Sequence, residues 1–134
     1  MTESRVPEGI FAPVATIFGP DGELDLAAYR ENAEFYATSS IDGIVILGSN
    51  GEYPLLDIDE RLRLIEAGVD AIAGRKIVMA GTGMESTRAT IALTKRAAEL
   101  GVDYALSLPC SLSGCCRRIP GPGHHLCHDG IHRG

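Results

Sequence analysis

The chain has 134 residues, enough for one domain of ordinary size and too few for two typical ones. Apolar residues make up 45% and charged residues 22%, a balance typical of a packed globular core. The net charge of −6 and a pI near 5.1 argue against a nucleic-acid-binding surface. No apolar run reaches the roughly 18–20 residues of a membrane helix, and Met1 to Glu8 carry no hydrophobic signal region, so we expect a cytoplasmic protein without membrane contact.

The composition changes abruptly near Cys110. Residues 1–110 hold 17 acidic and 9 basic residues, a net charge of −8, whereas residues 111–134 hold one acid and three bases, a net charge of +2. All four histidines lie in the last eleven residues, and three of the four cysteines lie in the same tail. We therefore treat residues 1–110 and residues 111–134 as two segments of different character.

Strand and helix signals alternate along the first segment. It opens with GIFAPVATIF at residues 9–18, where Pro13 favours the end of a strand over its middle. After the turn at residues 19–22, Asp25 can cap a helix whose apolar positions are Ala27, Ala28, Tyr29, Ala33, Phe35 and Tyr36. The unbroken apolar run IVIL at residues 44–47 is typical of a strand buried on both faces.

The same alternation then occurs twice more. Asp57 or Asp59 can cap a second helix, with an inner face of Leu62, Ile65, Val69 and Ile72, followed by a strand at residues 76–80. Ser86 or Thr87 can cap a third helix through Ile91, Thr94, Ala98 and Leu100, followed by a strand at residues 102–108. Alternating strands and helices with short loops predict an α/β fold with a parallel sheet.

The segment GSNGE, residues 48–52, is the strongest candidate for a binding site. It directly follows a buried strand, and ligands bind beyond the carboxyl ends of parallel strands. Ser49 and Asn50 offer a hydroxyl, an amide and backbone N–H groups suited to a small carboxylate, while Gly48 and Gly51 let the backbone approach a ligand closely. On spacing alone, a tight turn with capping side chains remains the simpler interpretation.

Three motifs together resemble one family. GIFAPVATIF, GSNGE after DGIVIL, and AGTGMEST after KIVM are similar, in order and spacing, to the dihydrodipicolinate synthase/N-acetylneuraminate lyase family over residues 9–110. The resemblance implies the N-terminal half of a (β/α)8 TIM barrel, truncated after about the fourth strand. It also implies a Schiff-base (class I) aldolase or lyase for pyruvate or a related small 2-oxo acid, without cofactor or metal, whose complete members are homo-oligomers. The loop, with Tyr53-Pro54-Leu55 after it, is most similar to the 4-hydroxy-2-oxoglutarate aldolase branch.

The resemblance assigns roles to two residues of the loop. Ser49 matches the hydroxyl that binds the oxo-acid carboxylate and takes part in a proton relay, and Asn50 matches the adjacent carboxylate-binding position. Ile17 stands where many members have proline, which is a minor departure. The segment Glu85-Ser86-Thr87 is interpreted as a helix start and not as a ligand site.

The groups that perform the family's chemistry have no match in this sequence. The family's Schiff-base lysine, on the sixth strand, and a tyrosine on the fifth would lie beyond residue 134, and Ser111 stands where a relay tyrosine is expected. The two lysines are Lys76, at the start of the third strand, and Lys95, on a solvated helix face; neither matches. We therefore expect the chain to be inactive, either as an incomplete enzyme or, alternatively, as a non-enzymatic remnant or weakly oxo-acid-binding half-barrel.

The tail, residues 111–134, shows neither a helical nor a strand period. Its cysteine and histidine doublets do not follow the usual spacings of zinc ligands. Its composition favours a frameshifted translation, and we expect it to be disordered. Structural zinc, or a truncated gene with a new ending, are the alternatives.

Overall fold

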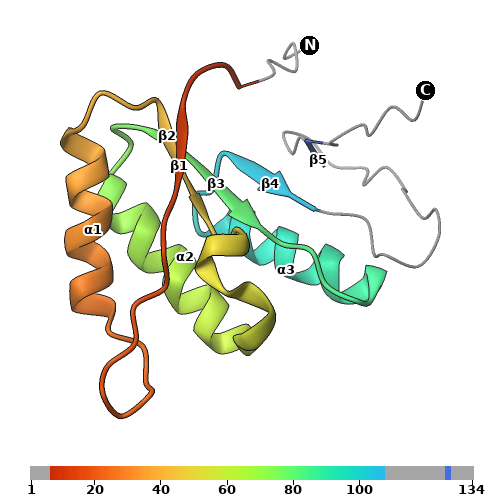
Figure 1. Cartoon of the computed structure of the whole chain (residues 1–134). Coiled ribbons are helices and arrows are strands. Elements are labelled where there is room, and N and C mark those ends of the chain that lie inside the picture. Colours follow the sequence, from red (N-terminus) through yellow and green to blue (C-terminus); the bar gives the residue numbers. More distant parts are fainter. Residues whose placement is uncertain (1–6, 108–125, 128–134) are drawn as a thin grey trace, which may run out of the picture.

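The structure, a computed structural model, describes residues 7–107 and 126–127 (Figure 1). Its strands are β1 (Phe11–Pro13), β2 (Gly43–Ile46), β3 (Ile77–Gly81), β4 (Tyr104–Leu106) and β5 (Leu126–Cys127). Its helices are α1 (Leu26–Thr38), α2 (Ile58–Ile72) and α3 (Thr87–Glu99), with two short 3-10 helices, η1 (Ser49–Gly51) and η2 (Tyr53–Leu55), between β2 and α2. The predicted alternation of strands and helices is confirmed.

All five strands are parallel and pair in the order β1-β2-β3-β4-β5. The three helices follow one another along one side of the sheet, as Figure 1 shows. The predicted α/β class with a parallel sheet is therefore correct. This arrangement places the carboxyl ends of β1 to β4 along one edge, where the loops that follow the strands meet.

The sequence predicts no strand after β4, and here the structure differs. Leu126–Cys127 pairs in parallel with β4, with Leu126 opposite Ala105 and Cys127 opposite Leu106. An open strand edge presents unpaired N–H and C=O groups, which another segment of the chain can satisfy regardless of its sequence period. The rest of the tail lies outside the described residues, so its frameshifted origin and its disorder stay predictions.

Each helix begins at a side-chain cap. Asp25 accepts a hydrogen bond from the Ala28 N–H (3.0 Å) at the start of α1, and Ser86 caps α3. Of the two candidates for α2, Asp57 is the cap: its Oδ1 accepts from the Glu60 N–H (2.8 Å), while Glu60 Oε2 accepts from the Asp57 N–H (2.9 Å). This reciprocal capping box fixes the point where the chain turns from the candidate site into α2.

The core lies between the sheet and the helices. The side chains of Ile44 and Ile46 are fully buried, and α2 packs its inner face on them. The predicted inner face is confirmed at Ile65 and Ile72, but Leu64 is buried there while Leu62 and Val69 are half-buried. In α1 the predicted apolar position Phe35 is 69% exposed, because the buried stripe of this helix runs through Tyr29, Ala33 and Ala37.

Tyr29 is buried without a partner for its hydroxyl. Its side chain is 1% exposed, and no group in the described residues forms a hydrogen bond with the hydroxyl. Burial raises the pKa of Tyr29, because the ionised phenolate would lose its hydration. An unpaired buried hydroxyl costs free energy that a phenyl ring does not.

We therefore expect Tyr29→Phe to raise the free energy of unfolding by about 1 kcal/mol. The folded protein keeps the Tyr29 proton while the unfolded chain releases it above about pH 10, so in the unsubstituted chain this residue makes stability fall as pH rises. Urea titrations at about pH 7 and about pH 10.5 measure both effects. A Tyr29→Phe variant that is less stable at pH 7, or equally sensitive to alkali, would contradict this account.

Two aspartates tie neighbouring strands together at the amino end of the sheet. Asp42 Oδ2 accepts a hydrogen bond from the Ile10 N–H (2.8 Å), and the Asp42 N–H donates to the Ile10 carbonyl (2.9 Å). In the same way, Asp103 Oδ2 accepts a hydrogen bond from the Val78 N–H (2.8 Å), and the Asp103 N–H donates to the Val78 carbonyl (2.9 Å). We call these pairs the aspartate clamps; the first joins β1 to β2 and the second joins β3 to β4.

Candidate functional site

The predicted site lies on the loop after β2, at the carboxyl edge of the sheet. The chain leaves β2, forms η1 with Ser49 and Asn50, and passes through η2 into α2; these are the yellow turns in Figure 1. Ser49 and Asn50 are exposed, and neither side chain has a hydrogen-bond partner within residues 7–107. As far as residues 7–107 are concerned, both therefore present a hydroxyl or an amide to a ligand without first breaking an internal bond.

The loop is held in place from both sides. Leu47 and Glu52 adopt left-handed backbone conformations, with φ of 58° and 54°, and so bracket the segment 48–51. Leu47 is only 2% exposed, and positive φ is uncommon for such a residue. On the β1 side, Thr16 Oγ1 donates a 2.6 Å hydrogen bond to the Gly51 carbonyl. The strand β2 ends one residue earlier than predicted because Leu47 turns the chain here.

Gly81 allows β3 to lie close to this turn. A Cβ at position 81 would stand 2.1 Å from the Leu47 carbonyl oxygen and 3.0 Å from its carbonyl carbon. Both are backbone atoms of a buried residue and cannot move aside cheaply. The position of the loop after β2 thus depends on a glycine in the neighbouring strand.

Arg61 is a buried side chain near the loop that sequence reasoning missed. It is 6% exposed in the first turn of α2, where its Nε donates to the Leu56 carbonyl (3.0 Å) and its guanidinium lies 5.5 Å from the centre of the Tyr53 ring. Its Nη1 contacts Met84 Sδ, in the loop after β3. Burial lowers the pKa of Arg61. The residue joins the loops after β2 and β3. The sequence signal for its burial is its helical spacing from Leu64 and Ile65, which places all three on the same face of α2.

The two lysines are remote from Ser49 and Asn50. Lys76 precedes β3 at the amino end of the sheet, where its Nζ donates to the carbonyls of Ser39 (2.9 Å) and Ile41 (2.7 Å). Lys95 lies exposed on α3. The interpretation of Lys76 as lying at the opposite edge from the site is confirmed, as is the helix start at Ser86. Neither lysine adds an amine to the candidate site.

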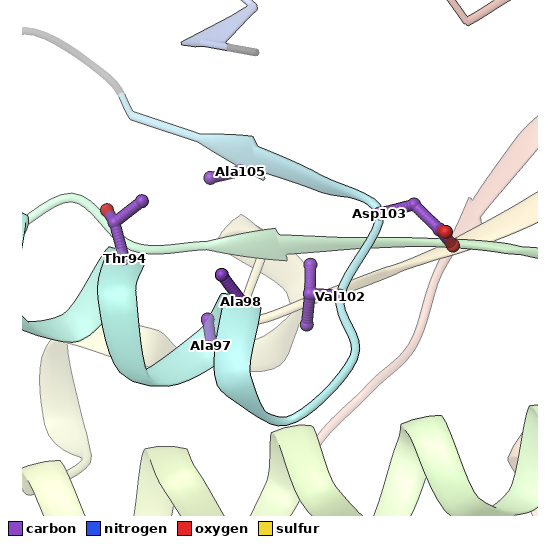
Figure 2. A pocket seen from close by; sticks show the side chains of 6 residues that line it. All are labelled: Thr94, Ala97, Ala98, Val102, Asp103 and Ala105. Carbon is purple, nitrogen blue, oxygen red and sulfur yellow. The ribbon is translucent and has the colours of Figure 1, made fainter. Parts of the chain in front are cut away.

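A shallow pocket lies elsewhere, between α3 and β4. Figure 2 shows its lining, which consists of Thr94, Ala97, Ala98, Val102, Asp103 and Ala105. The polar groups in this lining are already bonded: Thr94 Oγ1 lies 2.8 Å from Thr82 Oγ1, and Asp103 holds the Val78 N–H. The pocket is lined by the small side chains of Ala97 and Ala98 on α3 and of Ala105 on β4, and it is not part of the candidate site at the carboxyl edge.

The part of the chain that the structure describes offers neither a metal site nor a membrane span. No group of three or more histidine, cysteine, aspartate or glutamate side chains there is arranged to hold a metal ion. All four histidines, and with them the zinc alternative for the tail, lie outside that part. No helix among these residues is both long and apolar enough to cross a membrane.

Comparison with known proteins identifies relatives of residues 6–110. This range matches the model of the dihydrodipicolinate synthetase family. The 4-hydroxy-tetrahydrodipicolinate synthase of Xanthomonas campestris is 50% identical over 98 residues, which are 73% of this chain and 32% of that enzyme. The chain thus spans about a third of the length of this relative.

Solved structures show the same relationship. A dihydrodipicolinate synthase family protein from Coccidioides immitis superposes with a TM-score of 0.76 at 36% identity, covering 79% of this chain and 35% of that one. YagE of E. coli K12, solved in complex with pyruvate, gives a TM-score of 0.71 at 34% identity, covering 74% and 33%. The predicted fold is confirmed: the chain has the architecture of the N-terminal part of a TIM barrel, through its fourth strand.

Proposed function

Because this chain belongs to the dihydrodipicolinate synthetase family, a family of carbon–carbon lyases and synthases, we propose that its site binds the carboxylate of pyruvate or a related small 2-oxo acid. The observation that carries the proposal is the exposed pair Ser49 and Asn50, fixed between two left-handed residues at the carboxyl edge of the sheet. A neutral hydroxyl and an amide can hold an anion through hydrogen bonds to the charged acceptor. The pyruvate complex of YagE supports the choice of ligand.

In the complete enzyme, we assign two roles to this pair. Asn50 holds the carboxylate, and Ser49 binds it and also passes a proton between tyrosines during the reaction. A hydroxyl is suited to such a relay because it donates one hydrogen bond while it accepts another. The synthase name of the Xanthomonas relative and the aldolase-like loop point to different second substrates, so the branch within the family stays a prediction.

On their own, the 134 residues bind the oxo acid without turning it over. Imine formation requires a primary amine beside the carbonyl, which then acts as an electron sink. Lys76 is engaged with two backbone carbonyls at the opposite edge, and Lys95 faces solvent on α3. These placements favour the alternative of a non-enzymatic, oxo-acid-binding half-barrel over a working aldolase.

Borohydride trapping tests this directly. We expect no reduced pyruvate adduct, by intact-mass measurement, when the chain is treated with pyruvate and borohydride, because neither lysine lies at the site. A complete family enzyme, treated in parallel, serves as the positive control. A stoichiometric adduct that disappears in Lys76→Arg or Lys95→Arg would show that the chain has a competent lysine and would overturn the proposal.

A further inference from the structure

The first glycine of the GSNGE loop is not required by the fold. Gly48 has φ −73° and ψ −176°, a conformation that any residue adopts. A Cβ at this position would lie 3.5 Å from Val45 Cγ1 and 4.0 Å from Pro13 Cβ, which are ordinary van der Waals distances. Gly43, Gly68 and Gly81 differ, because a Cβ there would come within 2.1–2.4 Å of existing atoms.

A side chain at position 48 would point to the side of the sheet that faces away from the helices. Pro13 and Val45 lie opposite each other on β1 and β2, and the position of a Cβ on Gly48 is beside both. The neighbours of Val45, Ile44 and Ile46, belong to the core under the helices, and side chains alternate between the faces of a strand. Pro13 is exposed and Val45 half-buried, so among the described residues this space is open and apolar.

We propose that Gly48 is a specificity-determining residue: the absence of its side chain reserves the space for the carbon chain of the bound 2-oxo acid. This inference rests on the proposed function, in which Ser49 and Asn50 hold the carboxylate. A ligand held there extends its remaining carbons past Gly48 toward Pro13 and Val45. The apolar lining suits a short, uncharged chain such as the methyl group of pyruvate.

The test compares three variants of the full chain in pyruvate binding and in stability. Pyruvate is titrated into the isotope-labelled chain while the backbone amide shifts of the loop are followed by NMR, and urea unfolding is measured separately. We expect Gly48→Ala to unfold at the same urea midpoint as the unsubstituted chain but to bind pyruvate about tenfold or more weakly, the scale of one methyl group in a substrate pocket. Ser49→Ala is expected to weaken binding as well, because Asn50 alone then holds the carboxylate.

Ser40→Thr is the control. It also adds one methyl group to an exposed residue, but Ser40 lies between α1 and β2, at the amino edge of the sheet and away from the candidate site. We expect this variant to bind pyruvate like the unsubstituted chain.

The outcomes separate the proposed function, that the loop binds pyruvate, from the inference that Gly48 leaves space for it. If the unsubstituted chain shows no pyruvate-dependent shifts, the proposed function fails and the inference falls with it. If it binds and Ser49→Ala binds more weakly, but Gly48→Ala binds as well as the unsubstituted chain, the inference alone is overturned. A Gly48→Ala chain that is strongly destabilised would also overturn it, because the fold would then require the glycine.

Discussion

Gly81→Ala is expected to lower the free energy of unfolding by about 2–4 kcal/mol, the largest loss of stability that we foresee for a single methyl group in this chain. The added Cβ would overlap the Leu47 carbonyl oxygen at 2.1 Å. Leu47 is buried and already in a left-handed conformation, so its carbonyl cannot turn away without disturbing both β2 and the loop that follows. Urea unfolding followed by circular dichroism measures the loss.

The control for this substitution is Gly48→Ala, which adds a methyl group on the other side of the same turn. That methyl group meets atoms at 3.5 and 4.0 Å, so the urea midpoint should not change. If Gly81→Ala were as stable as this control, β3 would have to lie farther from Leu47 than the structure shows, and the account of how the loop is held would be wrong.

Ser49→Ala is expected to lower turnover by about 10²-fold or more in a protein whose reading frame is restored near codon 111, on the usual scale for a proton-transfer group. The frameshift hypothesis predicts that a one-base shift gives a tyrosine close behind Cys110, then a fifth strand with a tyrosine and a sixth with the Schiff-base lysine. Imine formation, measured by borohydride trapping, should survive in the variant because the lysine is untouched. Steady-state kinetics with pyruvate measure turnover.

Ser40→Ala provides the comparison for Ser49→Ala. Ser40 is also exposed, but it lies between α1 and β2, at the amino edge of the sheet, so its removal should leave turnover unchanged. Equal losses in the two variants would remove the assigned role of Ser49. A DNA sequence with no such open frame would remove the frameshift hypothesis itself.

The elements of the fold were predictable because their signals are local. Asp57 with Glu60 three residues later is a capping box visible in the sequence, and the run at residues 44–47 is apolar on both faces. The position of the candidate loop was also predictable, since its place after a buried strand decides which edge of the sheet it occupies. Its role in binding stays a prediction.

What could not be predicted depends on contacts between segments distant in the sequence. Arg61 reads as a surface charge until the loops after β2 and β3 close around it. The exposure of Phe35 depends on which stripe of α1 meets α2. Because Phe35, Tyr36 and Ala37 are consecutive and all apolar, the sequence does not decide which of them is buried. In the sequence, Leu47 is the last residue of an apolar run and is therefore predicted to belong to the strand. Its left-handed conformation becomes apparent only in the structure, where it turns the chain beside Gly81.

The aspartate clamps have a consequence for how such barrels can be recombined. They close two pairs of strands, β1 with β2 and β3 with β4, each with its own carboxylate, while the backbone pairing of β2 with β3 and the close fit of Gly81 against Leu47 join the two pairs. A crossover between β2 and β3 leaves both carboxylate bonds whole, provided that the incoming β3 carries a glycine beside the Leu47 carbonyl. In gene fusion or in laboratory shuffling, chimeras that are joined there and keep this glycine should therefore fold more often than those joined one strand earlier or later.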